Sequence, residues 1–273
     1  MDTAFDCQLN YARQWATDCM LEKQYWSDDE CWFITLTYAD EYLPTYEYKR
    51  EDGKSYKGIS LRKKDYQDFL KRLRAHYHCS CKYLLAGEYG SETQRPHYHM
   101  IIFGLPLNTT NFKFIGRNNN GDALWTEPEL QKIWRKGNII IGQVTFKSVS
   151  YVVRYTIKKW KNKDANLNKL YGRIDEFIAM SQGIGQKYYE DNKEQIIKQG
   201  GVITEFGKIE LPKRFLKKLQ KEDSEKYEDL KRKSQKIAEQ NEKIKNQQTD
   251  MQPEERRQKE DYLRNKNFKN IRR

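Results

Sequence analysis

Apolar and polar residues alternate along several segments, and a period of two predicts β-strands. The clearest segment is Cys-Trp-Phe-Ile-Thr-Leu-Thr-Tyr at residues 31–38, which is also rich in β-branched and aromatic residues. The other predicted strands are residues 82–88, 97–103 and 138–146.

Two further segments show helical spacing. In residues 60–77 the apolar positions form one stripe, and Ser60 is a candidate N-cap. Residues 148–160 also fit a helix, with Ser148 near its N-cap, although the Val and Ile content allows a strand as well.

The order of these elements indicates the fold class. A strand, a helix and two strands joined by a turn-rich link at residues 90–96 predict an α+β fold, with a largely antiparallel sheet and packed helices. Beyond residue 205 the composition shifts to 21 basic and 14 acidic residues with few apolar ones. We therefore expect one domain over residues 1–204 and a charged, helical or partly disordered tail over 205–273. The tail is either a solvated segment or a non-specific clamp on DNA or a partner.

Composition narrows the function classes. The chain of 273 residues has a net charge of +12, yet 13% of its residues are aromatic, so a packed core is expected. No apolar run approaches the roughly 20 residues of a membrane span, and the N-terminus does not resemble a signal peptide. Five cysteines without framework spacing suit reduced thiols in a cytosol. A basic, tyrosine-rich chain fits a nucleic-acid partner, although charge by itself is weak support.

Three residues form a candidate metal site. His97 and His99 share one face of a predicted strand, because residues i and i+2 point the same way. Taken alone, such a pair is more often ordinary polar surface. Glu88 ends the preceding predicted strand, and a hairpin would bring its carboxylate beside them. Two imidazoles and one carboxylate with open positions suit a catalytic Mn²⁺ or Mg²⁺.

The predicted helix over residues 148–160 carries two tyrosines one turn apart. Tyr151, Tyr155 and Lys158 cluster roughly opposite a stripe that includes Val149 and Val153. Either the tyrosines face the sheet and its metal site, or they are core residues and the valines meet another helix. A lysine beside Tyr155 would favour phenolate, the form that attacks phosphorus. Tyrosine, lysine and a metal could then cleave a phosphodiester and hold the product as a phosphotyrosine ester.

Four stretches together resemble the HUH endonucleases, and more narrowly the rolling-circle replication initiators of gokushoviruses within the Microviridae. The stretches are Phe-Ile-Thr-Leu-Thr-Tyr at 33–38, Gly-Glu-Tyr-Gly at 87–90 with Arg-Pro-His-Tyr-His at 95–99, Tyr-Val-Val-Arg-Tyr-Thr-Ile-Lys-Lys at 151–159, and Met-Ser-Gln-Gly-Ile-Gly at 180–185. Leu-Pro-Lys-Arg-Phe at 211–215 also resembles a later gokushovirus segment. At 182 the chain has Gln where the group is expected to have Arg and Pro before the glycine, so residues 180–185 are also consistent with a simple turn.

The resemblance implies a ferredoxin-like or RNA-recognition-like sheet of about five antiparallel strands. It also implies nicking of single-stranded phage DNA at the origin, a 5′-phosphotyrosine link and a free 3′-hydroxyl for the host replication machinery, in the host bacterial cytoplasm and without a membrane partner. By motif, Glu88, His97 and His99 would hold Mg²⁺ or Mn²⁺. Tyr155, with Lys158 three residues on, would be the first nucleophile and Tyr151 the second.

Other functions fit parts of the same pattern. The chain could be a non-catalytic nucleic-acid-binding protein, or a related HUH transposase or relaxase. The further candidates for DNA contact are Thr35, Thr37, Arg154 and Lys159. Alternation in a half-buried strand explains the two threonines equally well. The segment His-Tyr-His-Cys-Ser-Cys at 76–81 is interpreted as the end of a helix rather than a zinc site, because Cys-x-Cys is not the usual ligand spacing.

Overall fold

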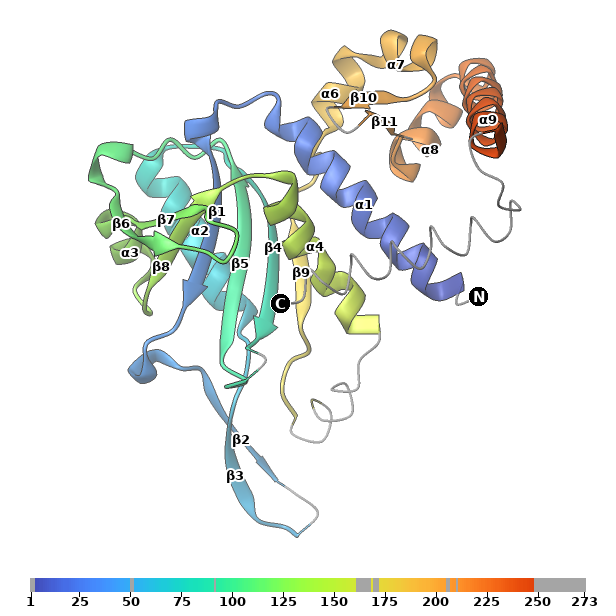
Figure 1. Cartoon of the computed structure of the whole chain (residues 1–273). Coiled ribbons are helices and arrows are strands. Elements are labelled where there is room, and N and C mark those ends of the chain that lie inside the picture. The colour runs from blue at the N-terminus through green and yellow to red at the C-terminus, as the bar shows by residue number, and fades with distance from the viewer. Residues whose placement is uncertain are drawn as a thin grey trace. The chain divides into compact units, whose positions relative to one another are not determined.

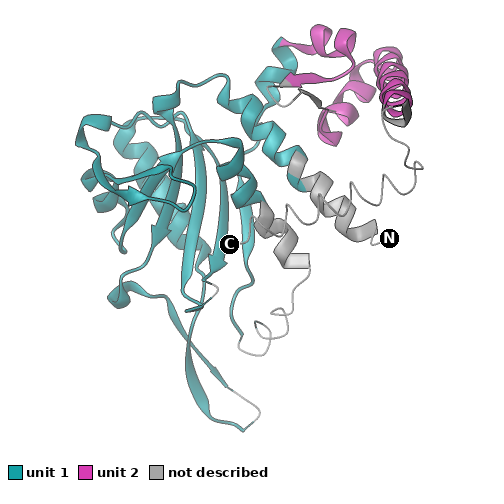
Figure 2. Cartoon of the chain, in the orientation of Figure 1, with its two compact units in different colours: residues 1–191 teal, residues 192–273 magenta. Residues whose placement is uncertain are grey.

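A computed structural model describes residues 3–49, 52–90, 92–160, 168, 172–204, 207–209 and 211–247. The chain divides into two compact units, residues 1–191 and 192–273 (Figure 2). The expected end of the functional domain at residue 204 stays a prediction, because compactness does not test where function resides. Among the described residues, no helix combines the length and apolar character needed to cross a membrane.

The first unit is built on a seven-stranded antiparallel sheet in the order β6-β7-β8-β1-β5-β4-β9 (Figure 1). Its strands are β1 (Cys31–Thr37), β4 (Lys82–Tyr89), β5 (Pro96–Phe103), β6 (Lys113–Arg117), β7 (Ala123–Thr126), β8 (Ile139–Gln143) and β9 (Phe177–Met180). The α+β class is confirmed, but the expectation of about five strands is wrong. The additional strands β6, β7 and β9 are short and peripheral, and pairing rather than a sustained apolar alternation defines them.

Four central strands and two helices follow the order β-α-β-β-α-β along the chain. Helix α2 (Lys63–Tyr77) connects β1 to β4, and α3 (Pro128–Trp134) lies between β5 and β8. Both helices cover one side of the sheet, called here the back face (Figure 1). Helix α4 (Phe146–Trp160) covers the other side, the front face, and α1 (Thr3–Lys23) packs along α4.

The main hydrophobic core lies on the back face. Even-numbered residues of β1, such as Ile34 and Leu36, are fully buried there with Phe69 and Leu73 of α2 and Trp134 of α3. The burial of large apolar side chains is the dominant favourable term for folding. Trp32 and Trp134 are among the aromatic residues buried in this core.

The helix caps differ from those expected. Helix α2 begins at Lys63, with Arg62 rather than Ser60 as its N-cap. The Ser60 hydroxyl instead donates to the Leu61 carbonyl and accepts from the Ile174 N–H. Strand β8 ends at Gln143, earlier than expected, because Thr145 already caps α4. The hydroxyls of Thr145 and Ser148 each accept from the other's backbone N–H, at 3.1 and 2.8 Å.

Several elements have no counterpart in the predicted pattern. A hairpin of β2 (Thr45–Lys49) and β3 (Ser55–Ile59) extends beyond the end of the large sheet (Figure 1). Three short 3₁₀ turns lie between elements: η1 (Asp28–Glu30) between α1 and β1, η2 (Asp40–Tyr42) between β1 and β2, and η3 (Thr109–Asn111) between β5 and β6. Helix α6 (Gln186–Asp191) completes the first unit.

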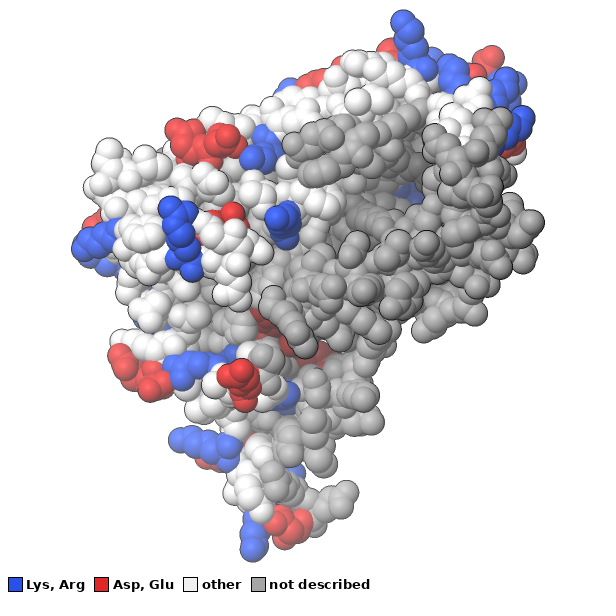
Figure 3. Space-filling view, viewed as in Figure 1, with Lys and Arg blue, Asp and Glu red and all other residues white. Residues whose placement is uncertain are grey.

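The second unit contains most of the predicted tail. Its elements are α7 (Lys193–Gln199), β10 (Val202–Thr204), β11 (Gly207–Ile209), α8 (Lys213–Glu222) and α9 (Ser224–Gln247). Helix α8 begins directly after Pro212, and it buries Phe215 and Leu219. On the face drawn in Figure 3, positive and negative side chains of the described residues are interspersed rather than gathered in one large patch.

Candidate metal centre

Strand pairing brings the three predicted ligands together on the front face. In the antiparallel pair of β4 and β5, Glu88 lies directly opposite His97. His99 is two residues further along β5 and therefore on the same face. On the other side of β5, Thr37 lies opposite His97 and Thr35 opposite His99. The predicted hairpin between residues 88 and 97 is thus what assembles the group.

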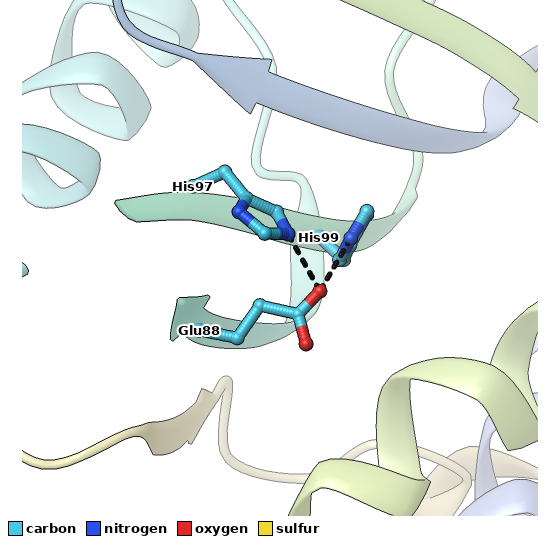
Figure 4. A group of neighbouring side chains, drawn as sticks. All are labelled: Glu88, His97 and His99. Atoms are coloured by element: carbon cyan, nitrogen blue, oxygen red, sulfur yellow. Dashed lines mark hydrogen bonds and ion pairs between the residues drawn. The ribbon is translucent and has the colours of Figure 1, made fainter. Parts of the chain in front are cut away.

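The ligand atoms meet at one point (Figure 4). Oε1 of Glu88 lies 2.7 Å from Nε2 of His97 and 2.7 Å from Nε2 of His99. The three candidate ligand atoms are all within 4.8 Å of one another, and among the described residues this is the group of His, Cys, Asp and Glu side chains that could hold a metal ion. Glu88 and His99 are buried, and His97 is half-buried.

A second layer of contacts orients both imidazoles. His97 Nδ1 lies 3.0 Å from the carbonyl oxygen of Arg95. Because a carbonyl only accepts, Nδ1 carries a proton. Nε2 then points at the centre: it donates to Glu88 when the ring is protonated and offers a lone pair to a metal ion when the ring is neutral. Nδ1 of His99 lies 2.9 Å from the Thr35 hydroxyl, and the Phe33 ring stacks on His99 with an interplanar angle of 9°. Such contacts fix the orientation of metal-binding histidines.

Electrostatics favour the charged carboxylate. Burial alone would raise the pKa of Glu88, but the hydrogen bonds from His97 and His99 outweigh it and hold the pKa below its usual value. Burial likewise opposes the protonated form of His97, yet the hydrogen bond to Glu88 raises its pKa. The site therefore favours an ionised Glu88 carboxylate beside a positive charge, which is either a protonated imidazole or a metal ion.

The donor set fits a divalent ion. One carboxylate oxygen and two imidazole nitrogens converge from adjacent strands, and a carboxylate against two lone pairs is unfavourable unless a cation lies between them. This buried group can hold a metal ion. Mixed oxygen and nitrogen donors suit Mn²⁺ better than Mg²⁺, which prefers oxygen alone.

On the back face, the residue between the two histidines is held by buried hydrogen bonds. The Tyr98 hydroxyl donates to the Arg62 carbonyl at 2.9 Å and accepts from the Arg62 N–H at 3.1 Å. It also lies 2.8 Å from the Tyr38 hydroxyl, which donates to Asp65 at 2.8 Å. Burial raises the pKa of Tyr98 to about 12, so the phenol stays protonated. This network ties the middle of the His-Tyr-His segment to the start of α2.

Helix α4 brings a tyrosine to the same site. The Tyr151 hydroxyl lies 3.4 Å from Nε2 of His99, and its ring contacts Phe33 edge-on. Val149 and Val153, on the expected stripe, are fully buried, and α1 packs against α4. Each of the two arrangements considered for this helix is therefore correct in part. Val149 and Val153 are buried, and Tyr151 faces the sheet.

Among the remaining predicted site residues, the structure describes the side chains of Thr35 and Thr37. Thr35 is buried beside His99, and the Thr37 hydroxyl donates to the Asn138 carbonyl at 3.3 Å, so their contact with DNA stays a prediction. Four others belong to α4, but their side chains lie outside the described residues. These are Arg154, Tyr155, Lys158 and Lys159.

Two residues near the centre had no assigned role in the sequence pattern. The Arg95 guanidinium donates to the Tyr38 carbonyl at 2.7 Å and pairs with Asp40 at 2.6 Å, while its own carbonyl orients His97. Glu176, just before β9, accepts from the Tyr89 N–H at 3.1 Å, and its charge helps to raise the His97 pKa. The Arg-Pro pair before His97 could have identified Arg95 from the sequence. No motif around Glu176 indicates its role.

Two other predicted segments have structural roles. Residues 76–81 end α2, with His78 as its C-cap in the left-handed region at φ 49°, which confirms the helix end. Residues 180–185 form a turn held by Glu22. The buried Glu22 carboxylate pairs with Lys82 at 2.9 Å and accepts from the Gly185 N–H at 2.7 Å, and Lys82 donates to the Gly183 carbonyl.

Comparison with known proteins gives a consistent picture. The family profile of replication-associated protein ORF2 matches residues 31–160, which span β1 to α4. The chain is 34% identical over 242 residues to replication-associated protein ORF2 of Spiroplasma virus 4, covering 85% of this chain and 71% of that protein. It is 30% identical to replication-associated protein VP4 of Bdellovibrio phage phiMH2K, covering 74% and 60%, and 31% identical to replication-associated protein ORF4 of Chlamydia phage 1, covering 58% and 42%. No solved structure matches. The chain belongs to this family of phage replication-associated proteins, in agreement with the gokushovirus resemblance of its motifs.

Proposed function

We propose that this protein is a metal-dependent endonuclease and strand transferase that nicks single-stranded phage DNA at the origin and so starts rolling-circle replication. The observation that carries the proposal is the convergence of Glu88, His97 and His99 with the Tyr151 phenol, 3.4 Å from His99. The β-α-β-β-α-β order with a central sheet order β8-β1-β5-β4 supports the ferredoxin-like HUH fold. Relatives named as replication-associated proteins favour replication over transposition or conjugation.

Glu88, His97 and His99 would hold Mn²⁺ or Mg²⁺. The bound ion would polarise the scissile phosphate and stabilise the leaving oxygen. The hydrogen bond that His97 donates to the Arg95 carbonyl and the one between His99 and the Thr35 hydroxyl keep both imidazoles aimed at the centre before any ligand arrives, which reduces the cost of ordering the site.

In the proposed reaction a tyrosine phenol loses its proton and its oxygen forms a bond to phosphorus. The bond from phosphorus to the 3′ oxygen breaks, and that oxygen takes up a proton. The products are a 5′-phosphotyrosine ester and a free 3′-hydroxyl for the host polymerase, and attack by a 3′-hydroxyl on the ester rejoins the strand. We assign the first attack to Tyr155, because Lys158 lies three residues on and a nearby cation favours phenolate. Tyr151, one turn earlier on α4, would make the second transfer.

Covalent trapping tests the proposal. Labelled oligonucleotides that tile the phage's single-stranded genome are incubated with the full chain and Mn²⁺ or Mg²⁺, then separated in denaturant. We expect an adduct with wild type that the double variant Tyr151→Phe with Tyr155→Phe does not form. Tyr83→Phe on β4 is the matched control and should keep it. The single variants identify the first nucleophile.

Three outcomes would overturn the proposal. An adduct that persists in the double variant would exclude both tyrosines. Binding of the oligonucleotides without any adduct, in either metal, would favour a non-catalytic nucleic-acid-binding protein. Selective cleavage of transposon ends or of a plasmid transfer site instead of phage sequence would favour the transposase or relaxase alternative.

A further inference from the structure

An open cavity of about 450 Å³ lies at the end of β1, outside the metal centre. Three segments line it: η2 and the residues before it, helix α3, and the turn that leads into β8. The lining residues are Ala39, Glu41, Tyr42, Pro128, Gln131, Lys132, Arg135, Gly137 and Asn138. A cavity of this size falls within the range that holds small organic ligands.

The floor of the cavity is rigid backbone. Gly137 has φ +151°, and a Cβ at this position would lie 2.4 Å from both the Ala39 nitrogen and the Thr37 oxygen. Hydrogen bonds close this contact, from the Ala39 N–H to the Lys136 carbonyl at 2.8 Å and from the Thr37 N–H to the Asn138 carbonyl at 3.0 Å. Only glycine allows such an approach, so the shape of the cavity is preformed.

The walls offer three kinds of contact. The Tyr42 ring is 48% exposed and can stack on a flat aromatic group. The Gln131 amide donates to Asn138 Oδ1 at 3.4 Å and accepts from the Thr126 hydroxyl at 3.4 Å. Both contacts are long, so a ligand can compete for these two amides. Lys132 and Arg135 are exposed cations; Lys132 pairs with Glu129 at 2.6 Å, and Glu41 is the acid in the cavity lining. A stacking ring, hydrogen-bonding amides and two cations match a base, its polar edge and a phosphate.

Arg95 connects this cavity to the metal centre. Its carbonyl orients His97, and its guanidinium holds the Tyr38 carbonyl and Asp40, the first residue of η2. Thr37, directly opposite His97, is two residues before Ala39 in the cavity wall. Two residues of chain span at most about 7 Å, so Ala39 in the cavity wall is near the position opposite His97.

We propose that this cavity binds one unpaired nucleotide of single-stranded DNA next to the phosphate held at the metal centre. The base stacks on Tyr42 and its edge is bound by Gln131 and Asn138, while Lys132 and Arg135 bind the backbone. The proposal rests on the proposed function, because it assumes that the metal centre receives single-stranded DNA.

Equilibrium binding in EDTA tests it. The probes are fluorescein-labelled (dA)₁₂, (dC)₁₂ and (dT)₁₂, measured by anisotropy with the full chain. We expect Tyr42→Ala to weaken binding about tenfold or more, while Tyr42→Phe keeps it, because stacking needs only the ring. Gln131→Ala combined with Asn138→Ala should reduce the discrimination among the three probes. Lys132→Ala and Arg135→Ala should weaken all probes alike and lower the salt dependence.

Matched controls lie elsewhere on the first unit. Phe114, 60% exposed on β6, is the aromatic control as Phe114→Ala, and its neighbour as Lys113→Ala is the cationic one. Both should bind like wild type. Wild-type affinity in Tyr42→Ala, together with wild-type discrimination in the double variant of Gln131 and Asn138, would overturn the proposal. Losses of affinity in the two control variants as large as those in the cavity variants would also overturn it.

The assay separates this proposal from the proposed function. Binding in EDTA needs neither metal nor nucleophile, so it can succeed for a protein that never forms an adduct. Conversely, adduct formation with unchanged binding in the cavity variants would leave the nuclease intact and remove the nucleotide site.

Discussion

The two faces of the central strands differ in what they bury. On the back face, Leu36 packs in a continuous apolar core, and the polar Tyr98 hydroxyl is satisfied by neighbours. On the front face, the polar Glu88, His99 and Thr35 are buried on the same side as fully buried apolar residues such as Ile101 and Phe103, and the three polar groups bond mainly to one another. Period-two alternation lets one strand serve both purposes, because adjacent residues point to opposite faces.

The difference teaches where stability and chemistry reside. Burial of apolar surface stabilises the back face, whereas buried polar groups on the front face cost free energy unless each finds a partner. We therefore expect back-face substitutions to change mainly the stability of the protein, and front-face substitutions to change mainly its ligand affinity.

The largest expected effect is on the back face. Leu36→Ala removes a fully buried side chain from the core and should lower the free energy of unfolding by about 2–5 kcal/mol. Chemical denaturation measures the loss. Where the variant is still folded, its Mn²⁺ affinity should match wild type, and a parallel fall in metal affinity would show that the faces are not separable.

The next effect is on the front face. Glu88→Gln keeps the shape of the side chain but removes the only carboxylate of the centre, so Mn²⁺ affinity should fall by about 100-fold or more. Titration calorimetry with Mn²⁺ measures it, with Glu47→Gln on the exposed β2 hairpin as the control. Unchanged affinity would exclude Glu88 as a ligand.

An intermediate effect comes from the residue that links the faces. Tyr98→Phe removes the acceptor of the Arg62 N–H and one of the two contacts of the Tyr38 hydroxyl, which still donates to Asp65, and should destabilise the fold by about 1–3 kcal/mol. Because Tyr98 stands between His97 and His99, a smaller loss of Mn²⁺ affinity should accompany it. The bound Mn²⁺ electron paramagnetic resonance spectrum distinguishes an altered centre from lower stability alone, and a wild-type spectrum would exclude a positioning role.

The smallest effect appears only at high pH. Burial raises the pKa of Cys31, at the start of β1, from 9.0 to about 12. Between these values the unfolded state binds fewer protons than the folded state, so stability is fully present below pH 9 and falls as pH rises. At pH 10 this thiol should account for a loss of stability on the order of 1 kcal/mol. Urea unfolding of wild type and Cys31→Ala at pH 8 and pH 10 measures the difference, and identical pH dependence would contradict it.

The sequence predicted the elements with strong periodicity and missed those without it. β1, β4, β5, α2 and α4 lie close to their expected ranges. Helix α1 was missed because several of its buried positions are small residues, such as Ala12, Ala16 and Cys19, which give a weak apolar signal. Strand β8 was drawn too long, because the Thr145 and Ser148 caps turn the chain into a helix while the apolar pattern continues.

For the site, spacing along the chain was informative about some residues and silent about others. His97 and His99 share a face in any strand, and a short hairpin was enough to suggest Glu88 as their neighbour. The contacts of Arg95 with Tyr38 and Asp40, the approach of Tyr151 to His99 and the charge of Glu176 join segments far apart in the chain. No local pattern encodes such contacts.

By itself the sequence determined the α+β class, the paired imidazoles with their carboxylate and the family motifs, because each depends on local periodicity or on residue identity. Only the tertiary structure decided the seven-strand order, the register that sets Glu88 against His97 and the cavity beside β1. The physical reason is that register and cavities arise from how segments distant in the chain pack together, and many sequences with the same alternation could pack differently.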